Sequence, residues 1–337
     1  MSWSELRREV GFAGSVLGRR PFDVLLQVTN RCNMKCTFCD FWPNGAPPEE
    51  ELSLPELRRL AADLAALGRC IVSIEGGEPF VRSDLVDIVR AFGRDHLPVL
   101  YTNGWYVTAE NARALFEAGL TQVGVSIDYP DQRHDAKRAL PGASHRAWRA
   151  VDLFREAAPH GGRQVHVMTV LTRDNAGDLE ALLKMTAERR VGHQVTLLST
   201  RGYRRGKGVD ALPDPGIGAR LLPLWDRYPH WRFFREYVER MDAFLSGGAM
   251  PTCHAGRQVF NVDHVGNVAV CIERIDEPVG NLRDAPLAEL HARLLSRQDE
   301  VARCQACWTA CRGVGQLLGD GGRASSWRDL ALRMRSR

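Results

Sequence analysis

Between residues 23 and 198, short apolar runs alternate with longer stretches in which apolar residues recur at helical spacing. The helical pattern is well marked at residues 53–67, where Ser53 and Glu56 form a capping-box pattern and Gly68 ends the periodicity. Short apolar strands that alternate with helices indicate an α/β fold with a parallel sheet. The expected strands cover residues 23–29, 71–74, 98–101, 122–127, 164–171 and 194–198, and the expected helices cover residues 53–67, 83–96, 109–119, 148–158 and 178–190.

Six β–α units are fewer than the eight that close a (β/α)8 barrel. In barrels of this kind the active site lies at the carboxyl ends of the strands, so the residues that follow each expected strand are the first candidates for chemistry. The chain is expected to divide into an N-terminal helix (1–22), the β/α core (23–215), a helical connector (216–248), a cysteine-bearing, glycine-rich region (249–322) and a C-terminal helix (323–337).

Composition narrows the class of protein. Hydrophobic residues make up 44% of the 337, which is ample for a core, yet no apolar run approaches the roughly 18 residues that a membrane span needs. Residues 1–20 carry charges throughout and lack the apolar core of a signal peptide, so we expect a cytoplasmic protein. The net charge is only +4 and no block of five like charges occurs, so neither a nucleic acid nor a membrane is expected as a partner.

Three of the nine cysteines lie within eight residues, directly after the first apolar run, in the spacing C-x3-C-x2-C. In a cytosolic protein such cysteines indicate a metal site rather than disulfides. Cys32, Cys36 and Cys39 would leave one iron of a four-iron cluster without a protein ligand, which is a place for chemistry. The alternative is a zinc knuckle, but no fourth ligand follows nearby, since the next cysteine is Cys70 at the start of an apolar strand.

Polar residues follow three of the expected strands. The segment 75–79 reads Glu-Gly-Gly-Glu-Pro, and its paired glycines would let the backbone approach a ligand closely. Residues 102–104 (Thr-Asn-Gly) and 126–128 (Ser-Ile-Asp) could bond to hydroxyl groups, although such residues also favour ordinary turns. In the fifth strand, alternation places His166 and Met168 on one face, where they could meet a substrate, although a buried histidine of the core is also expected.

A second group of cysteines lies near the C-terminus. Gly266 stands five residues before the second of them, between expected strands at 258–262 and 268–272, which indicates a hairpin turn. Four such cysteines can hold either zinc or a four-iron cluster, and spacing does not distinguish the two. The group consists of Cys253, Cys271, Cys304, Cys307 and Cys311.

The C-x3-C-x2-C loop, with Phe38 before its third cysteine, resembles the cluster loop of radical S-adenosylmethionine (radical SAM) enzymes. The resemblance implies a partial (β/α)6 barrel and a [4Fe-4S] cluster whose open iron chelates SAM. It also implies an external low-potential electron donor of the flavodoxin or ferredoxin type. Reduction would cleave SAM to methionine and a 5′-deoxyadenosyl radical, which abstracts hydrogen from the substrate.

The same resemblance assigns roles to residues around the cluster. The Gly-Gly-Glu motif would hold the amino group of SAM, Ser126 and Asp128 its ribose, and Arg138 its carboxylate. Phe38 would pack near the adenine, with backbone groups near Leu198 and Ser199. His134 and Asp135 are either catalytic or a surface pair, and no general acid or base stands out. The expected cofactor-binding residues are Phe38, Gly76, Gly77, Glu78, Pro79, Asn103, Ser126, Asp128 and Arg138.

The C-terminal cysteines resemble the auxiliary-cluster region of SPASM and twitch radical SAM enzymes. Full SPASM domains carry seven cysteines, whereas this region has five, so the resemblance implies a shortened domain with one auxiliary [4Fe-4S] cluster. Its implied ligands are Cys253, Cys271, Cys304 and Cys307, with Cys311 either a replacement for one of them or a spare.

The expected activity is radical modification of a substrate, for which a ribosomally made peptide is the first candidate. Only about twenty residues precede the first strand, too few for a peptide-recognition domain. A small molecule such as a sugar or aminocyclitol is therefore almost as strong a candidate as a peptide. The basic loop 201–207 is either a linker or a segment that would suit a charged substrate or SAM. The non-enzymatic alternatives are an iron–sulfur electron carrier and a zinc-stabilised binding protein.

Overall fold

The computed structural model describes residues 3–202, 211–318, 324–329 and 331. Nine strands form one sheet in the order β6-β5-β4-β3-β2-β1-β7-β8-β9, and the first six strands are parallel neighbours in chain order. The predicted α/β fold with a partial (β/α)6 barrel is thereby confirmed. The strands are β1 (Asp23–Thr29), β2 (Ile71–Gly76), β3 (Leu97–Thr102), β4 (Gln122–Ser126), β5 (Val165–Leu171), β6 (Gly192–Leu197), β7 (Val259–Val262), β8 (Asn267–Ala269) and β9 (Gly280–Asn281).

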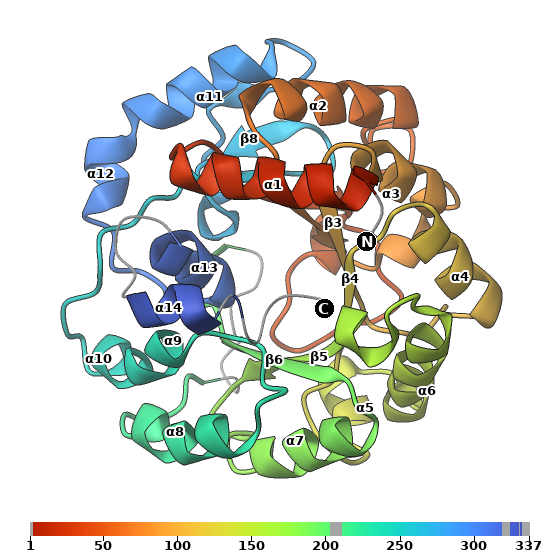
Figure 1. The fold of residues 1–337 in the computed structure, drawn as a ribbon, viewed down its shortest axis with the longest axis vertical. Helices are drawn as coiled ribbons and strands as arrows, with labels where there is room; N and C mark the ends of the chain where they lie inside the picture. The colour runs from red at the N-terminus through yellow and green to blue at the C-terminus, as the bar shows by residue number, and fades with distance from the viewer. Residues whose placement is uncertain (1–2, 203–210, 319–323, 330, 332–337) are drawn as a thin grey trace.

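Helices surround the parallel strands, and α2, α3, α4, α6, α7 and α8 form a ring around them in Figure 1. The expected helices are present, although α6 begins five residues before its predicted start. The helices are α1 (Trp3–Leu17), α2 (Leu54–Leu67), α3 (Leu85–Gly93), α4 (Ala109–Glu117), α5 (Arg133–Arg138), α6 (Ala143–Ala157), α7 (Leu179–Glu188), α8 (Ile217–Arg227), α9 (Arg235–Glu239), α10 (Met241–Leu245), α11 (Leu287–Ser296), α12 (Gln298–Ala302), α13 (Ala310–Leu318) and α14 (Ala324–Asp329).

The two faces of the strands differ in character. In β1, Val24, Leu26 and Val28 are buried in the large apolar cluster that includes residues of α2, α3 and α4. Asp23 and Leu25, at alternate positions of β1, face a cavity inside the barrel, and several residues of the neighbouring strands that line it are polar. An apolar outer face holds the helices in place, while a polar inner face leaves room for a ligand.

Helix α1 covers the amino-terminal end of the barrel. Phe12 and Val16 line the cavity together with Asp23 and Leu97, which begin β1 and β3. The Arg8 guanidinium donates to the carbonyls of Gly93, Gly119 and His96 at 2.8, 3.2 and 3.5 Å, which fixes α1 to the turns that precede β3 and β4. Figure 1 shows α1 lying across the strands.

The cysteine-bearing C-terminal region continues the barrel sheet. Strand β7 pairs in parallel with β1, from Asp23 opposite Val259 to Leu26 opposite Val262. The predicted hairpin is present, and Gly266 lies in its turn with φ of +94°. The hairpin of the C-terminal region therefore extends the main sheet beyond β1.

Helix α13 contacts both β6 and β7, the strands that flank the open side of the partial barrel. Its first backbone N–H, on Ala310, is donated to the Thr196 hydroxyl on β6 at 3.0 Å. At Gly315, a side chain would lie 2.7 Å from Val259 of β7, so the glycine permits this close approach. Within the described residues, no helix combines the length and the apolar character needed to cross a membrane.

Candidate active site

The three cysteines of the C-x3-C-x2-C loop all line one cavity of about 390 Å³, which runs through the barrel. Met34 and Phe38 anchor the loop in a small apolar cluster with Ala143 and Leu198, and all four of these residues are buried. Cys36 belongs to the same cluster, and Met34 and Phe38 line the cavity as well, so the apolar residues of the loop hold its thiols at the cavity wall.

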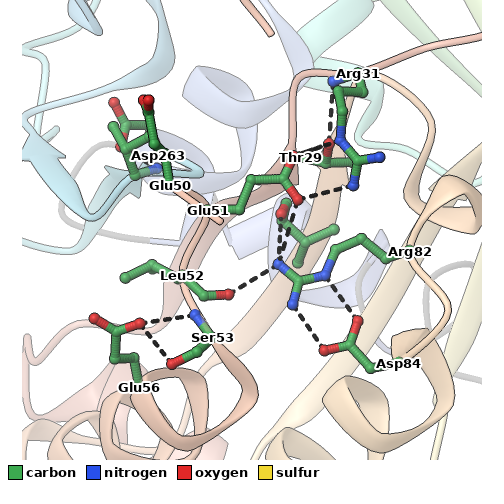
Figure 2. Close-up of polar contacts among 12 residues, drawn as sticks. Thr29, Arg31, Glu50, Glu51, Leu52, Ser53, Glu56, Arg82, Asp84 and Asp263 are labelled. Atoms are coloured by element: carbon green, nitrogen blue, oxygen red, sulfur yellow. Dashed lines mark hydrogen bonds and ion pairs between the residues drawn. The ribbon is translucent and has the colours of Figure 1, made fainter. Parts of the chain in front are cut away.

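The base of this loop is held by buried Glu51, as Figure 2 shows. Arg31 donates to both carboxylate oxygens of Glu51 at 3.0 Å, and the Thr29 hydroxyl donates to one of them. Arg82 donates to the carbonyls of Val28 and Leu52 at 3.1 and 2.9 Å and pairs with Asp84. Sequence reasoning did not find Glu51 or Arg82, because no local pattern marks a side chain that bonds across the sheet.

Without a metal, burial keeps the thiols of this loop in the protonated form. Burial raises the pKa of the Cys32 thiol to about 12, and it also raises the pKa of Cys36, where the nearby Arg138 cation opposes the shift. Bound iron would replace this desolvation penalty with direct coordination of the thiolates. Among the described residues, no group of three His, Cys, Asp or Glu side chains is placed to hold a single metal ion. A four-iron cluster distributes its thiolates over several irons, so the three thiols need not converge on one.

Gly76 and Gly77, at the end of β2, permit a close contact with the base of the cysteine loop, whereas the sequence suggested a close contact with a ligand. Gly76 has φ of +132°, and a side chain there would lie 2.0 Å from the Thr29 carbonyl oxygen. At Gly77 a side chain would lie 2.2 Å from the carbonyl oxygen of Arg31. The glycines thus let the end of β2 pack against the base of the cysteine loop, while both residues also line the cavity.

The Glu78 carboxylate, which the sequence suggested for the amino group of SAM, is bound by the protein's own groups in this structure. Glu78 is fully buried and accepts hydrogen bonds from the Thr102 hydroxyl at 2.8 Å and from the backbone N–H groups of Asn103 and Phe80 at 2.7 and 3.1 Å. Burial raises its pKa to about 7 despite these bonds. Neither Glu78 nor Pro79, which starts a short 3₁₀ helix, is among the residues that line the cavity. Glu78 instead joins the ends of β2 and β3.

Asp128 and Arg138 bind each other. The Nε and Nη2 atoms of Arg138 lie 2.9 and 2.7 Å from one carboxylate oxygen of Asp128, and the other oxygen accepts from the Val170 N–H at 3.0 Å. Asp128 is fully buried and is not among the residues that line the cavity, whereas Ser126, the other residue expected at the ribose, does line it. Arg138 lines the cavity, with Nη1 3.9 Å from the Cys36 sulfur.

Of the remaining residues predicted to contact SAM or the substrate, some line the cavity and one is buried in the core. Phe38 lines the cavity, and the guanidinium carbon of Arg138 lies 5.2 Å from its ring centre. Asn103 lines it too, and its amide donates to the Asn33 side chain at 2.8 Å. Met168 lines the cavity, whereas His166 is buried against the Tyr101 ring and is not among the lining residues.

The structure also shows the surroundings of three residues with weaker assignments. His134 is buried, and its Nδ1 accepts the Asp128 backbone N–H at 3.1 Å, so it is neither a surface residue nor open to a ligand. Asp135 accepts the N–H groups of Gly142 and Ser144 at the start of α6. The Ser199 hydroxyl contacts Glu273 of the C-terminal region. The basic loop 201–207 lies mostly outside the described residues.

All five C-terminal cysteines line a second cavity of about 400 Å³. Buried Arg312 connects the segments that form this cavity. Its guanidinium donates to the carbonyls of Cys307, Cys304 and Pro251 at 2.7, 3.0 and 3.0 Å. Burial raises the pKa of Cys307 to about 12 and also raises the pKa of Cys271. Cys311 also lines the barrel cavity, so it stands in the wall between the two cavities.

Comparisons with known proteins agree with this arrangement. Residues 26–186 match the sequence family described as the Radical SAM superfamily. The AdoMet-dependent heme synthase of Methanosarcina barkeri is 34% identical over 317 residues, covering 85% of this chain and 88% of that protein. The AdoMet-dependent heme synthase of Oleidesulfovibrio alaskensis is 32% identical over 161 residues, covering 47% of this chain and 40% of that protein.

Among solved structures, native anSMEcpe with bound AdoMet and the Cp18Cys peptide has a similar fold. Its TM-score is 0.64 at 20% sequence identity, and the alignment covers 94% of this chain and 93% of that one.

Proposed function

The chain belongs to the radical SAM superfamily, and from this premise we propose that it cleaves SAM at a [4Fe-4S] cluster held by Cys32, Cys36 and Cys39. When bound and reduced, the cluster supplies the electron that splits SAM into methionine and a 5′-deoxyadenosyl radical. The radical then removes a hydrogen atom from a substrate in the barrel cavity. The single observation that carries this proposal is that all three thiols open onto one cavity at the carboxyl ends of the strands.

The chain's own residues would bind and orient SAM. Backbone groups at Gly76 and Gly77 lie at the cavity wall and are our candidates for the amino group, in place of the Glu78 side chain. Phe38 offers an aromatic face for the adenine, and Asn103 and Ser126 offer polar groups for the ribose. Arg138 is the candidate for the SAM carboxylate, with Asp128 holding its guanidinium in place.

We further propose one auxiliary [4Fe-4S] cluster in the second cavity. Cys253, Cys271, Cys304 and Cys307 are the proposed ligands, and five thiols in one wall give one more than a single cluster needs. Cys311 lies between the cavities, so it is placed either to replace a ligand or to face the substrate. Such a cluster would take up the electron left on the substrate after hydrogen abstraction.

For the substrate we propose a ribosomally made peptide, with a small molecule such as an aminocyclitol as the second candidate. Both can bring a protonated nitrogen, which the lining of the barrel cavity favours. The name of the heme synthase relatives suggests a tetrapyrrole, and heme carries carboxylate side chains. The buried Asp23 carboxyl group in the cavity lining is less suited to such carboxylates than to a protonated nitrogen.

Electron paramagnetic resonance of the reduced, reconstituted protein tests the proposal. SAM binding at an open iron should change the spectrum of the N-terminal cluster, and the change should be absent from the Cys32/Cys36/Cys39→Ala variant. An identical spectrum with and without SAM would favour a closed electron-carrier cluster and overturn the proposal.

A further inference from the structure

Arg138 is a buried cation that lies against the cysteine loop. Its side chain is 9% exposed, and arginine is rarely buried to this degree unless it is paired. The guanidinium carbon lies 5.2 Å from the centre of the Phe38 ring, and the Thr37 N–H of the loop donates to the Lys137 carbonyl at 3.4 Å. These two contacts hold the end of α5, where Arg138 stands, against the loop that carries the thiols.

Asp128 fixes the orientation of this guanidinium. Nε and Nη2 of Arg138 lie 2.9 and 2.7 Å from one carboxylate oxygen of Asp128, and the other oxygen accepts the Val170 N–H at 3.0 Å. The backbone N–H of Asp128 is donated to His134 Nδ1 at 3.1 Å. Because both the side chain and the backbone of Asp128 are held, the guanidinium is kept in one orientation.

In that orientation the remaining nitrogen of Arg138 is directed to the cluster site. A guanidinium group has five N–H donors, one on Nε and two on each Nη atom. Asp128 takes the donor on Nε and one on Nη2, and Nη1 lies 3.9 Å from the Cys36 sulfur, a distance at which sulfur accepts a hydrogen bond. Arg138 also lines the barrel cavity, so one donor of Nη1 can serve Cys36 while the other serves the SAM carboxylate.

Of the two buried charges, the cation acts more strongly on Cys36. The Arg138 charge lowers the pKa of the Cys36 thiol and the Asp128 charge raises it, and the effect of Arg138 is the larger of these two, although burial keeps the pKa raised. A cation that favours negative charge on a sulfur also favours an added electron on a cluster bound through that sulfur. Hydrogen bonds to ligand sulfurs and the local charge are among the factors that set the potential of an iron–sulfur cluster.

We propose that Arg138 and Asp128 set the reduction potential of the [4Fe-4S] cluster at the cysteine loop, with Arg138 raising the potential and Asp128 limiting the rise. The inference rests on the proposed function and gives the pair a role beyond binding the SAM carboxylate. Both residues act through Cys36, so they are positioning residues for the reaction. A higher potential makes the cluster easier to reduce by an external donor, which every turnover that consumes an electron requires.

The test is a redox titration of the iron-reconstituted protein, followed by electron paramagnetic resonance in the absence of SAM. Leaving SAM out separates an effect on the cluster from a loss of SAM binding. The signal of the N-terminal cluster is obtained by subtracting the spectrum of the Cys32/Cys36/Cys39→Ala variant. Thermal melts confirm that each variant is folded.

The two members of the pair should shift the potential in opposite directions. Arg138→Gln should make reduction at least tenfold less favourable, a fall of about 59 mV or more for one electron, and Asp128→Asn should make it more favourable. Arg133→Gln is the matched control, because it removes an exposed cation of the same helix that pairs with Asp131 and Asp178. Solvent and salt screen that charge, so the control should change the equilibrium by less than about twofold.

The opposite signs separate this role from a purely structural one. A variant that only disturbed the loop would shift the potential without regard to the sign of the charge removed. Unchanged potentials, or shifts of the same sign in both variants, would overturn the inference. Because Arg138→Gln leaves the Asp128 charge buried without its partner, the double variant Arg138→Gln/Asp128→Asn provides a second test. It should still be reduced less readily than the wild type, since Arg138 has the larger effect.

The same proteins, reduced in the presence of SAM, are assayed for 5′-deoxyadenosine. Opposite shifts in a protein that makes no 5′-deoxyadenosine would support the role of the pair and refute the proposed reaction. Formation of 5′-deoxyadenosine by the wild type, with equal potentials in all variants, would refute the role of the pair alone. A protein that takes up no iron at the cysteine loop would overturn both.

Discussion

Replacing Asp23 by Asn is expected to stabilise the protein, and to stabilise it more at high pH than at low pH. The substitution keeps the shape of the side chain and its contact with Ser73 but removes a buried charge. If Asp23 served only to stabilise the fold, Asp23→Asn would instead lower the unfolding free energy, because most substitutions at buried polar groups destabilise a protein.

The magnitude follows from the proton affinity of Asp23. Burial, with a smaller effect of the Glu75 charge, raises the pKa of Asp23 from 3.8 to about 7. Each tenfold change in proton affinity corresponds to about 1.4 kcal/mol, so the ionised side chain costs the folded state about 4 kcal/mol. The unfolded chain loses the proton near 3.8 and the folded protein near 7, so this part of the unfolding free energy is lost as pH rises between those values. The gain for Asn is then about 2 kcal/mol at pH 5.5 and about 4 kcal/mol at pH 8.

Thermal melts of wild type and Asp23→Asn at these two pH values provide the assay. With an unfolding entropy of about 2.1 cal/mol/K per residue, 1 kcal/mol corresponds to a Tm change of about 1.4 °C in a protein of 337 residues. We expect a gain of about 3 °C at pH 5.5 and about 6 °C at pH 8. A Glu110→Gln control, in the exposed first turn of α4, should change by less than about 1 °C at both pH values. A loss of stability in Asp23→Asn, or a gain that does not depend on pH, would refute the reasoning.

Three other outcomes are expected. Cys36→Ala should bring SAM cleavage to background in a product assay, because an open four-iron cluster needs all three thiolates; a variant that still cleaves SAM would contradict the ligand assignment. Iron analysis should give about eight irons per chain in the wild type and about four when Cys32, Cys36 and Cys39 are all replaced by Ala. About four irons in the wild type and none in the variant, with zinc present in both, would instead indicate a structural zinc site at the C-terminal cysteines. Glu51→Gln should lower the unfolding free energy by about 3 kcal/mol, since Arg31 and Arg82 lose a buried partner, and should reduce iron retention; unchanged denaturant unfolding would argue against this anchor.

Features set by nearby residues could be predicted from the sequence. The six parallel strands follow from apolar runs, and the turn of the C-terminal hairpin follows from Gly266. The cysteine triplet was identifiable because its three members lie within eight residues.

Features set by distant residues could not be predicted in this way. Glu78 and Asp128 follow strands at positions typical of ligand-binding residues. In the structure, however, Glu78 accepts a hydrogen bond from the Asn103 N–H group, and Asp128 forms an ion pair with Arg138. Whether a strand-end carboxylate faces a ligand or a neighbour depends on the packing of adjacent strands, and no local pattern encodes that choice. The pairing of β7 with β1 joins residues more than 230 positions apart, so no local pattern predicted that the C-terminal hairpin extends the barrel sheet. Asp23 could have been recognised from the sequence, because it is a charged residue in an apolar strand, at a position whose side chain points to the inside of the barrel.

The most direct test of the central claim is the formation of 5′-deoxyadenosine. Protein reconstituted anaerobically with iron and sulfide is mixed with SAM and a strong reductant, and the nucleoside is measured by mass spectrometry. The account predicts 5′-deoxyadenosine from the wild type in amounts that exceed the Cys36→Ala variant by at least a hundredfold. Equal, background amounts from both proteins, with the wild-type cluster fully loaded, would contradict it.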